Sequence, residues 1–254
     1  MADQAHAVDK LAPSPDALAA SAARGRPHVT LKAACSLDGR TATAGGESQW
    51  ITGPEARAHV MRLRAAHTAI CAGIGTVLAD DPALTVRPAP DASPAPGAPQ
   101  PTRVMLDSTA RTPLDARVLT ADGARRIVLC GNGAPAARVA ALRGMGVEVW
   151  CANTPRPDPD AFLPWLFEAG VRSLLVEGGG MVAGSFIARG AVDALFLYMA
   201  PIVLGGGGAP GWSGAFTAPT LPEAPGFEFA PPIRLGRDLL LQGTPVTPAP
   251  GRRT

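Results

Sequence analysis

Apolar and polar residues alternate along this chain in two kinds of segment. Short apolar runs, typical of buried strands, lie at 29–35, 69–72, 103–106, 126–130, 147–151, 174–176, 194–199 and 238–242. Segments with helical spacing lie between several of them, at 54–66, 135–144, 160–169 and 181–189. This order predicts an α/β fold, with a mainly parallel central sheet and helices on both of its faces. The last strands have no helix between them, which indicates an antiparallel edge.

The helix at 54–66 has the clearest start signal. Thr52-Gly-Pro-Glu55 fits a capping box, in which the threonine hydroxyl caps the helix and proline occupies its first turn. The buried stripe of this helix is expected at Ala56, Val60 and Leu63.

Three segments fall outside the pattern of strands and helices. Residues 1–26 and 244–254 are expected to be flexible tails, the first with a short helix at most. The proline-rich stretch 88–101 is expected to be a surface loop. The remaining residues, 27–243, then form one domain.

Composition narrows the class of protein. The chain of 254 residues is 46% hydrophobic and 17% charged, which is enough for a packed core. A net charge of +2 gives no reason to expect nucleic-acid or membrane binding, and no export signal is present, so we expect a cytoplasmic protein. The four cysteines have no CxxC spacing and the four histidines do not cluster, so we expect reduced thiols and no metal site.

A glycine-rich turn follows the run at 174–176. Glu177 ends the run, and Gly178-x-Gly180-x-x-Ala183 matches a dinucleotide-binding fingerprint. The motif comes late in the chain and lacks the acidic residue that closes the next strand in a Rossmann domain, so that domain is not expected. Two interpretations remain: a turn that holds phosphates at a helix start, or a glycine-rich turn without a ligand.

Charged and aromatic residues lie near other strand ends. Lys32 is inside an apolar strand, where it either extends to solvent or acts as a cation or proton donor toward a substrate. Arg64 and Arg87 suit an anionic group, although solvent-exposed arginines are the simpler interpretation. The loop before the first predicted helix adds Ser48 and Trp50. Because ligands of open α/β sheets gather at the carboxyl ends of strands, these residues predict a cleft there.

Five motifs together resemble the reductase domain of bacterial riboflavin biosynthesis proteins. They lie, in order, at 32–41, 46–52, 75–87, 106–113 and 176–179, and the resemblance extends over 26–242. It implies a dihydrofolate-reductase-like fold and NADPH as the cofactor of an oxidoreductase. The implied reaction reduces 5-amino-6-(5-phosphoribosylamino)uracil to 5-amino-6-(5-phosphoribitylamino)uracil.

The resemblance also implies residue roles. The implied catalytic residues are Lys32, which would assist ring opening or proton transfer, Glu177, which would bind the pyrimidine ring, and Asp38 as a helper. The substrate would also contact Ser48, Leu84 and the two arginines that would take its 5′-phosphate, Arg64 and Arg87. The cofactor would contact Ala34, Trp50, Thr76, Asp80, Ser108, Gly179, Gly180, Met181, Val182, Ala183, Gly184 and Ser185.

The chain departs from the family pattern in two places. Full-length bacterial members carry a zinc deaminase domain before the reductase, and this chain has neither His-x-Glu nor Pro-Cys-x-x-Cys. We therefore expect a separate deaminase to supply the substrate. The glycine-rich stretch 205–212 is the second departure, and its role stays open.

The sequence favours a homodimeric reductase of a phosphorylated pyrimidine, and it leaves two alternatives. One is a reductase of the same fold that acts on another pyrimidine or a pterin-like ring. The other is a non-catalytic NADPH-binding partner of a deaminase. Retention of Arg64, Arg87 and Glu177 favours the phosphorylated pyrimidine, and the presence of Lys32 favours an enzyme.

Overall fold

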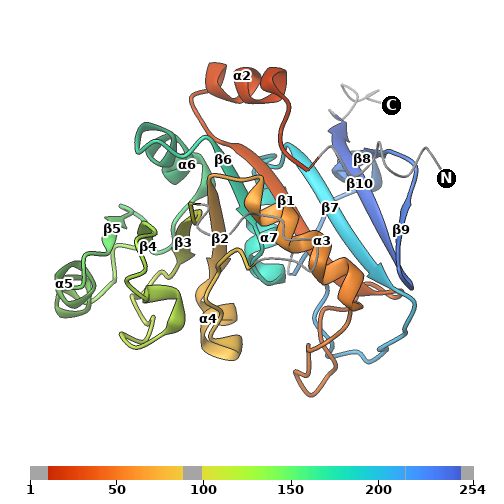
Figure 1. The fold of residues 1–254 in the computed structure, drawn as a ribbon, viewed down its shortest axis with the longest axis horizontal. Coiled ribbons are helices and arrows are strands. Elements are labelled where there is room, and N and C mark those ends of the chain that lie inside the picture. Colours follow the sequence, from red (N-terminus) through yellow and green to blue (C-terminus); the bar gives the residue numbers. More distant parts are fainter. Residues whose placement is uncertain (1–10, 88–98, 215, 247–254) are drawn as a thin grey trace.

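A single sheet of ten strands runs through the described part of the chain (Figure 1). The computed structural model describes residues 11–87, 99–214 and 216–246. The strands are β1 (His28–Ser36), β2 (Ala69–Gly73), β3 (Thr102–Leu106), β4 (Arg126–Cys130), β5 (Glu148–Cys151), β6 (Ser173–Val176), β7 (Ala194–Ala200), β8 (Gly226–Phe229), β9 (Ile233–Leu235) and β10 (Asp238–Val246). Their order is β5-β4-β3-β2-β6-β1-β7-β10-β8, and β9 pairs with β10.

The pairing of the strands confirms the predicted sheet type. All pairings between two strands of the set β1 to β7 are parallel. Strand β10 is antiparallel to β7, β8 and β9, which gives the predicted antiparallel edge. The carboxyl ends of β1 to β7 therefore gather at one end of the sheet, and the loops after β1 and β7 hang from that end at the bottom of Figure 1.

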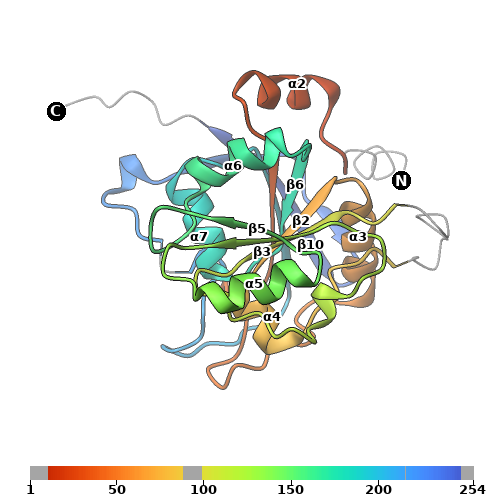
Figure 2. The ribbon, with the colours of Figure 1, turned by 90° about the vertical axis from the view of Figure 1, so that its left-hand side faces the viewer.

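Helices cover both faces of the sheet, as predicted (Figure 2). One face carries α3 (Pro54–Ala65), α4 (Ile74–Asp80) and α5 (Ala136–Gly144), and the other carries α6 (Pro159–Glu168) and α7 (Gly180–Ala188). Helix α2 (Pro15–Ala23) lies at the end of the sheet opposite the loops after β1 and β7, and short 3-10 helices lie at Arg117–Leu119 and Leu221–Glu223. In the described residues, no helix has the length and apolar character needed to cross a bilayer.

Strand β1 shows how the sequence divides the sheet into two faces. Val29 and Leu31 are fully buried in a core that includes Phe162 of α6 and Phe186 of α7. Successive residues of a strand point to opposite faces, so Lys32 points to the face covered by α3. A lysine between apolar residues thus marks the face on which the candidate site lies.

The start of α3 differs from the prediction of a capping box. Gly53 is the N-cap residue and no side chain within the box bonds to the helix start, so the capping role of Thr52 is wrong. The N–H of Gly53 instead donates to Oδ2 of Asp238, at 2.6 Å, because the start of β10 lies against this end of the helix. The predicted stripe of α3 is buried, at Ala56, Val60 and Leu63.

Both segments expected as tails contain regular structure. Helix α2 begins after Ser14, whose hydroxyl caps it, and Arg24 and Arg26 then bind Asp193 at the start of β7. Strand β10 continues to Val246, because 244–246 pair with β8, so this part of the predicted C-terminal tail is corrected to strand. Most of the predicted proline-rich loop, 88–98, lies outside the described residues.

Two buried histidines pack between α3 and the sheet and make stability depend on pH. Burial is the main cause that lowers the pKa of His59 and of His67 from 6.5 to about 4. Between these pH values the unfolded chain binds protons that the folded chain does not bind. The free energy of unfolding therefore falls as the pH falls from 6.5 to 4.

We expect His59→Gln to flatten this pH dependence. Glutamine does not titrate and can keep a hydrogen bond with Tyr198, so one histidine's share of the slope is lost, roughly 1.4 kcal/mol per pH unit at most. Urea denaturation between pH 4 and 6.5 measures it. An unchanged slope would show that His59 does not contribute.

Candidate active site

Three charged side chains from different elements meet at the carboxyl end of the parallel strands. Lys32 comes from β1, Arg64 from the last turn of α3, and Glu177 directly follows β6. Leu31 pairs with Val176 across the two strands, so the residues after them, Lys32 and Glu177, point to the same face. The sheet register therefore brings together residues that lie far apart in the sequence.

Arg64 and Glu177 form a two-pronged ion pair. Nε of Arg64 donates to Oε1 of Glu177 at 2.7 Å, and Nη2 donates to Oε2 at 2.9 Å. Nη1 of Arg64 donates to the carbonyl oxygen of Thr85 at 3.0 Å. The side chain of Arg64 is 14% exposed and that of Glu177 is 6% exposed. The two hydrogen bonds therefore fix both charged groups where they are largely shielded from solvent. Two N–H donors of the guanidinium remain beyond these three contacts.

The charges of this cluster set the protonation states. Burial on its own would raise the pKa of Glu177, but the positive charges of Arg64 and Lys32 outweigh burial and lower it. Burial lowers the pKa of Lys32, and the attraction of Glu177 opposes this only in part. A carboxylate that stays ionised and a lysine that releases its proton more easily suit polar recognition and proton transfer.

Behind Lys32 lies a polar pair that the sequence analysis missed. Nζ of Lys32 is 5.8 Å from the centroid of the Tyr198 ring, and the Tyr198 hydroxyl is 2.8 Å from Nδ1 of His59. Burial raises the pKa of Tyr198 well above its ordinary value, so its hydroxyl stays protonated. A signal was present in the sequence, because His59 interrupts the apolar stripe of α3 and Tyr198 is the single tyrosine, inside an apolar strand.

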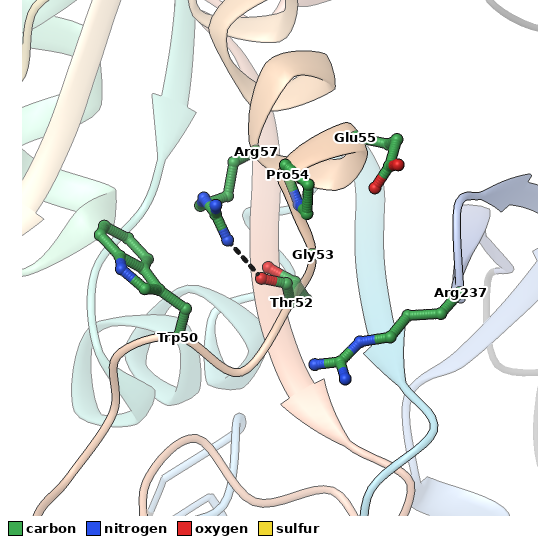
Figure 3. A pocket seen from close by; sticks show the side chains of 7 residues that line it. All are labelled: Trp50, Thr52, Gly53, Pro54, Glu55, Arg57 and Arg237. Atoms are coloured by element: carbon green, nitrogen blue, oxygen red, sulfur yellow. Dashed lines mark hydrogen bonds between the residues drawn. The ribbon is translucent and has the colours of Figure 1, made fainter.

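The loop 45–53, between β1 and α3, is joined to α4. Trp50 is 64% exposed, and the Arg57 guanidinium lies over its ring at 4.7 Å from the ring centroid. Nε2 of Gln49 donates to Asp80 of α4 at 3.0 Å, and Ser48 is half-buried in the same loop. A depression of about 420 Å³ lies beside the loop. Its lining residues, shown in Figure 3, are Trp50, Thr52, Gly53, Pro54, Glu55, Arg57 and Arg237.

The start of α7 presents backbone N–H groups with no side-chain cap. Gly179, the N-cap residue, is exposed, and so is Met181. A helix start of this kind suits phosphate groups. In the later part of the run expected to bind the cofactor, Ala183 and Gly184 are buried, and Val182 and Ser185 are half-buried.

Two glycines of this turn are needed for packing. A Cβ atom at Gly178 would lie 2.5 Å from Cβ of Val182, and one at Gly180 would lie 2.4 Å from the carbonyl oxygen of Gly211. The loop through Gly211 and Gly214 therefore lies directly on the first turn of α7. This contact gives the glycine-rich stretch 205–212 a structural role that the sequence left open.

Other residues expected near the cofactor lie around the same end of the sheet. The hydroxyl of Thr76 lies 3.8 Å from where a Cβ of Gly179 would be, so α4 and α7 present their first turns to one another. Ala34 is on the face of β1 that carries Lys32, two residues further on. Ser108 follows β3, and its carbonyl oxygen accepts a hydrogen bond from Gly131.

The remaining candidates lie in the segment after α4 and in the turn after β1. Leu84 is buried and Arg87 is exposed, on either side of the carbonyl that Arg64 binds. Asp38 lies in the turn after β1, where it accepts hydrogen bonds from the hydroxyl of Ser36 and from the N–H groups of Leu204 and Gly205. Asp38 thereby joins the turn after β1 to the loop after β7, and these bonds lower its pKa to about 2.

Comparison with known proteins identifies a family. The model of the RibD C-terminal domain matches residues 27–223. The riboflavin biosynthesis protein RibD of Bacillus amyloliquefaciens is 39% identical over 221 residues, which cover 87% of this chain and 58% of that protein. The 2,5-diamino-6-ribosylamino-4(3H)-pyrimidinone 5′-phosphate reductase of Methanothermobacter thermautotrophicus is 40% identical over 219 residues, covering 86% of this chain and 98% of that protein.

A solved structure supports the same relationship. Acinetobacter baumannii RibD matches with a TM-score of 0.76 at 30% identity, over 91% of this chain and 61% of that one. The α/β architecture is thus the dihydrofolate-reductase-like fold that the motifs implied. The chain belongs to the RibD C-terminal domain family. It spans 58% of the length of the Bacillus relative.

We expect Glu177→Ala to destabilise the fold by about 3 kcal/mol, because it leaves Arg64 and Lys32 partly buried without their counter-charge. Removing Arg64 as well takes away one uncompensated charge. The double variant Arg64→Ala/Glu177→Ala should therefore lose less stability than the sum of the two single variants. Urea denaturation at pH 7 measures all three, and strictly additive losses would contradict a direct energetic coupling.

Proposed function

We propose that this protein uses NADPH to reduce 5-amino-6-(5-phosphoribosylamino)uracil at the first carbon of its ribose. The observation that supports this most is the ionised Glu177, held by Arg64 beside Lys32. Membership of the RibD C-terminal domain family, and a relative that is named a reductase, favour the same activity.

The reaction needs a protein that binds, orients and moves protons. Opening of the ribose ring takes a proton from the amino nitrogen, gives one to the ring oxygen and leaves a C=N bond. Reduction then adds a hydride to the carbon and a proton to the nitrogen. NADPH supplies the hydride when bound.

Each proposed role follows from the lone pairs, N–H donors or proton that the side chain has available for a ligand. Glu177 has lone pairs beyond its two contacts with Arg64, which suit the N–H groups of a pyrimidine. The free donors of Arg64, with Arg87, suit the 5′-phosphate, and Ser48 and Leu84 border the substrate. Lys32, whose pKa is lowered by burial, gives a proton to the ring oxygen and recovers one from the amino nitrogen during ring opening, with Asp38 as a helper. It then gives the nitrogen the proton that the reduction consumes, and water restores it.

The cofactor is proposed to lie across the starts of α4 and α7. The uncapped N–H groups at the start of α7 suit its phosphates, and Thr76 faces that turn. Ala34, Trp50, Asp80 and Ser108 lie around this end of the sheet and complete the proposed contacts. By family membership, we also propose a homodimer that works in the cytoplasm.

A second candidate substrate is the pyrimidine before deamination. The archaeal relative, which this chain covers over 98% of its length, is named for the 2,5-diamino pyrimidinone, whereas the RibD relatives are named for the pathway. Both substrates carry the ribose phosphate and differ in the ring, so Glu177 contacts the part that distinguishes them.

We expect the purified protein to oxidise NADPH in the presence of the deaminated compound, which is followed by the loss of absorbance near 340 nm. Parallel reactions with the compound before deamination decide between the two candidates through their kcat/KM ratio. A protein that binds NADPH but reduces neither compound would be a non-catalytic binding partner, and the proposal would fail.

We expect Glu177→Gln to raise the KM for the pyrimidine on the order of tenfold, because a charged acceptor is lost at the ring. The Kd for NADPH should change little, since the carboxylate of Glu177 is bonded to Arg64 and its charge acts on Lys32. Glu168→Gln, at the end of α6, is the matched control. Loss of NADPH binding in Glu177→Gln would show that Glu177 belongs to the cofactor site.

A further inference from the structure

The loop 45–53 ends in consecutive residues whose backbone groups are bound by side chains. Nη1 of Arg57 donates to the carbonyl oxygen of Thr52 at 2.7 Å, and this bond stays within the loop and α3. The other two bonds come from the turn between β9 and β10. Nη2 of Arg237 donates to the carbonyl oxygen of Ile51 at 3.2 Å, and Oδ2 of Asp238 accepts from the N–H of Gly53 at 2.6 Å.

Asp238 is a fully buried carboxylate with one strong contact. Its Oδ1 atom is buried without a hydrogen bond, and the nearest cation, Nε of Arg237, is 3.7 Å away. A buried charge of this kind is costly unless it is compensated. The compensation is the N–H of Gly53 together with the positive end of the α3 dipole, so Asp238 serves as the cap that the sequence of α3 lacks.

The turn between β9 and β10 is seated directly on α3. Gly236 has a φ of +62°, and a Cβ atom there would lie 2.5 Å from Oε2 of Glu55 in the first turn of the helix. Figure 3 shows Arg237 reaching from this turn toward Thr52, with Trp50 on the opposite side of Thr52. A shift of the turn would break the bonds from Arg237 to Ile51 and from Gly53 to Asp238.

The same loop carries the residues proposed to meet both ligands. Ser48 and Trp50 lie in it, and Gln49 ties it to Asp80 of α4. The family model ends at residue 223, whereas β9 and β10 lie at 233–246. The element that fixes the loop thus lies outside the part of the chain that the family model matches.

We propose that Arg237 and Asp238 are positioning residues for the loop 45–53 and, through it, for the ligands that Ser48 and Trp50 contact. The effect on ligands rests on the proposed function. The two side chains act on the backbone of Ile51 and Gly53, and they hold the loop in the conformation that receives the ligands.

Hydrogen exchange and steady-state kinetics test this proposal on four variants of the full chain. Arg237→Ala and Asp238→Ala each remove one bond to the loop. Asp238→Asn keeps an oxygen that can accept from Gly53. Arg234→Ala is the matched control, because Arg234 is an exposed arginine of β9 in the same hairpin.

In Arg237→Ala and Asp238→Ala we expect amides of 45–53 to exchange faster, and the KM for the pyrimidine to rise roughly tenfold, because a displaced loop misplaces the ligand. Asp238→Asn should recover most of both effects. Arg234→Ala should match the unmodified protein. A defect limited to folding would instead raise exchange throughout the sheet and would leave KM unchanged in the folded fraction.

Equal loop exchange and equal KM in Arg237→Ala and Arg234→Ala would overturn the proposal. Arg237 is 55% exposed, so its removal tests the loop even if Asp238→Ala does not fold. If the unmodified protein reduces neither pyrimidine, the proposed function fails. The exchange rates of 45–53 then still decide whether the turn between β9 and β10 holds this loop.

Discussion

The nearly buried carboxylate of Glu177 is the constraint on which the site depends. An ionised group that is 6% exposed needs nearby cations, and the structure supplies them from two elements: Arg64 of α3 and Lys32 of β1. The guanidinium compensates most of the charge through two short hydrogen bonds. Lys32 is then a second cation in a cluster that is already neutralised, and this together with burial makes its proton easier to release.

Helix α3 is fixed at both ends by carboxylates from distant parts of the chain. At its end, Arg64 binds Glu177, 113 residues away, and at its start, Gly53 binds Asp238, 185 residues away. Between these points, His59 and Tyr198 hold the middle of the helix against β7. Helix α3 therefore connects two segments of the site. Arg64 near its end binds the carbonyl oxygen of Thr85, and Arg57 near its start binds the loop 45–53. Ligand contacts carried by these two segments are set by the same helix.

The sequence predicts local features of this structure well and long-range contacts poorly. The period of apolar residues locates most strands and helices along the chain, since that period follows from burial along each element. The alternation of strands and helices then predicts helices on both faces of the sheet. The capping box at Thr52 is a local pattern that the structure does not use. Asp238 accepts the hydrogen bond at the start of α3 instead, and its position depends on how β10 packs. The glycines at 178–180 can be read from the sequence. The sequence does not show that Val182 packs against Gly178 and that the loop at Gly211 packs against Gly180. The motifs identify Arg64 and Glu177 as separate contacts, and only the packing of α3 on the sheet shows that they bind one another.

This pairing has a consequence for the proposed reaction. A phosphate that takes the two remaining donors of Arg64 adds negative charge beside Glu177 without breaking the pair. A phosphate on Arg64 offsets the positive charge that helps to lower the pKa of Lys32, so this pKa rises from the lowered value of the free protein. Binding of the phosphorylated substrate would then load the lysine with the proton that the reaction consumes, at the moment when the substrate is in place. In the proposed complex, a pyrimidine without the phosphate would lack this effect.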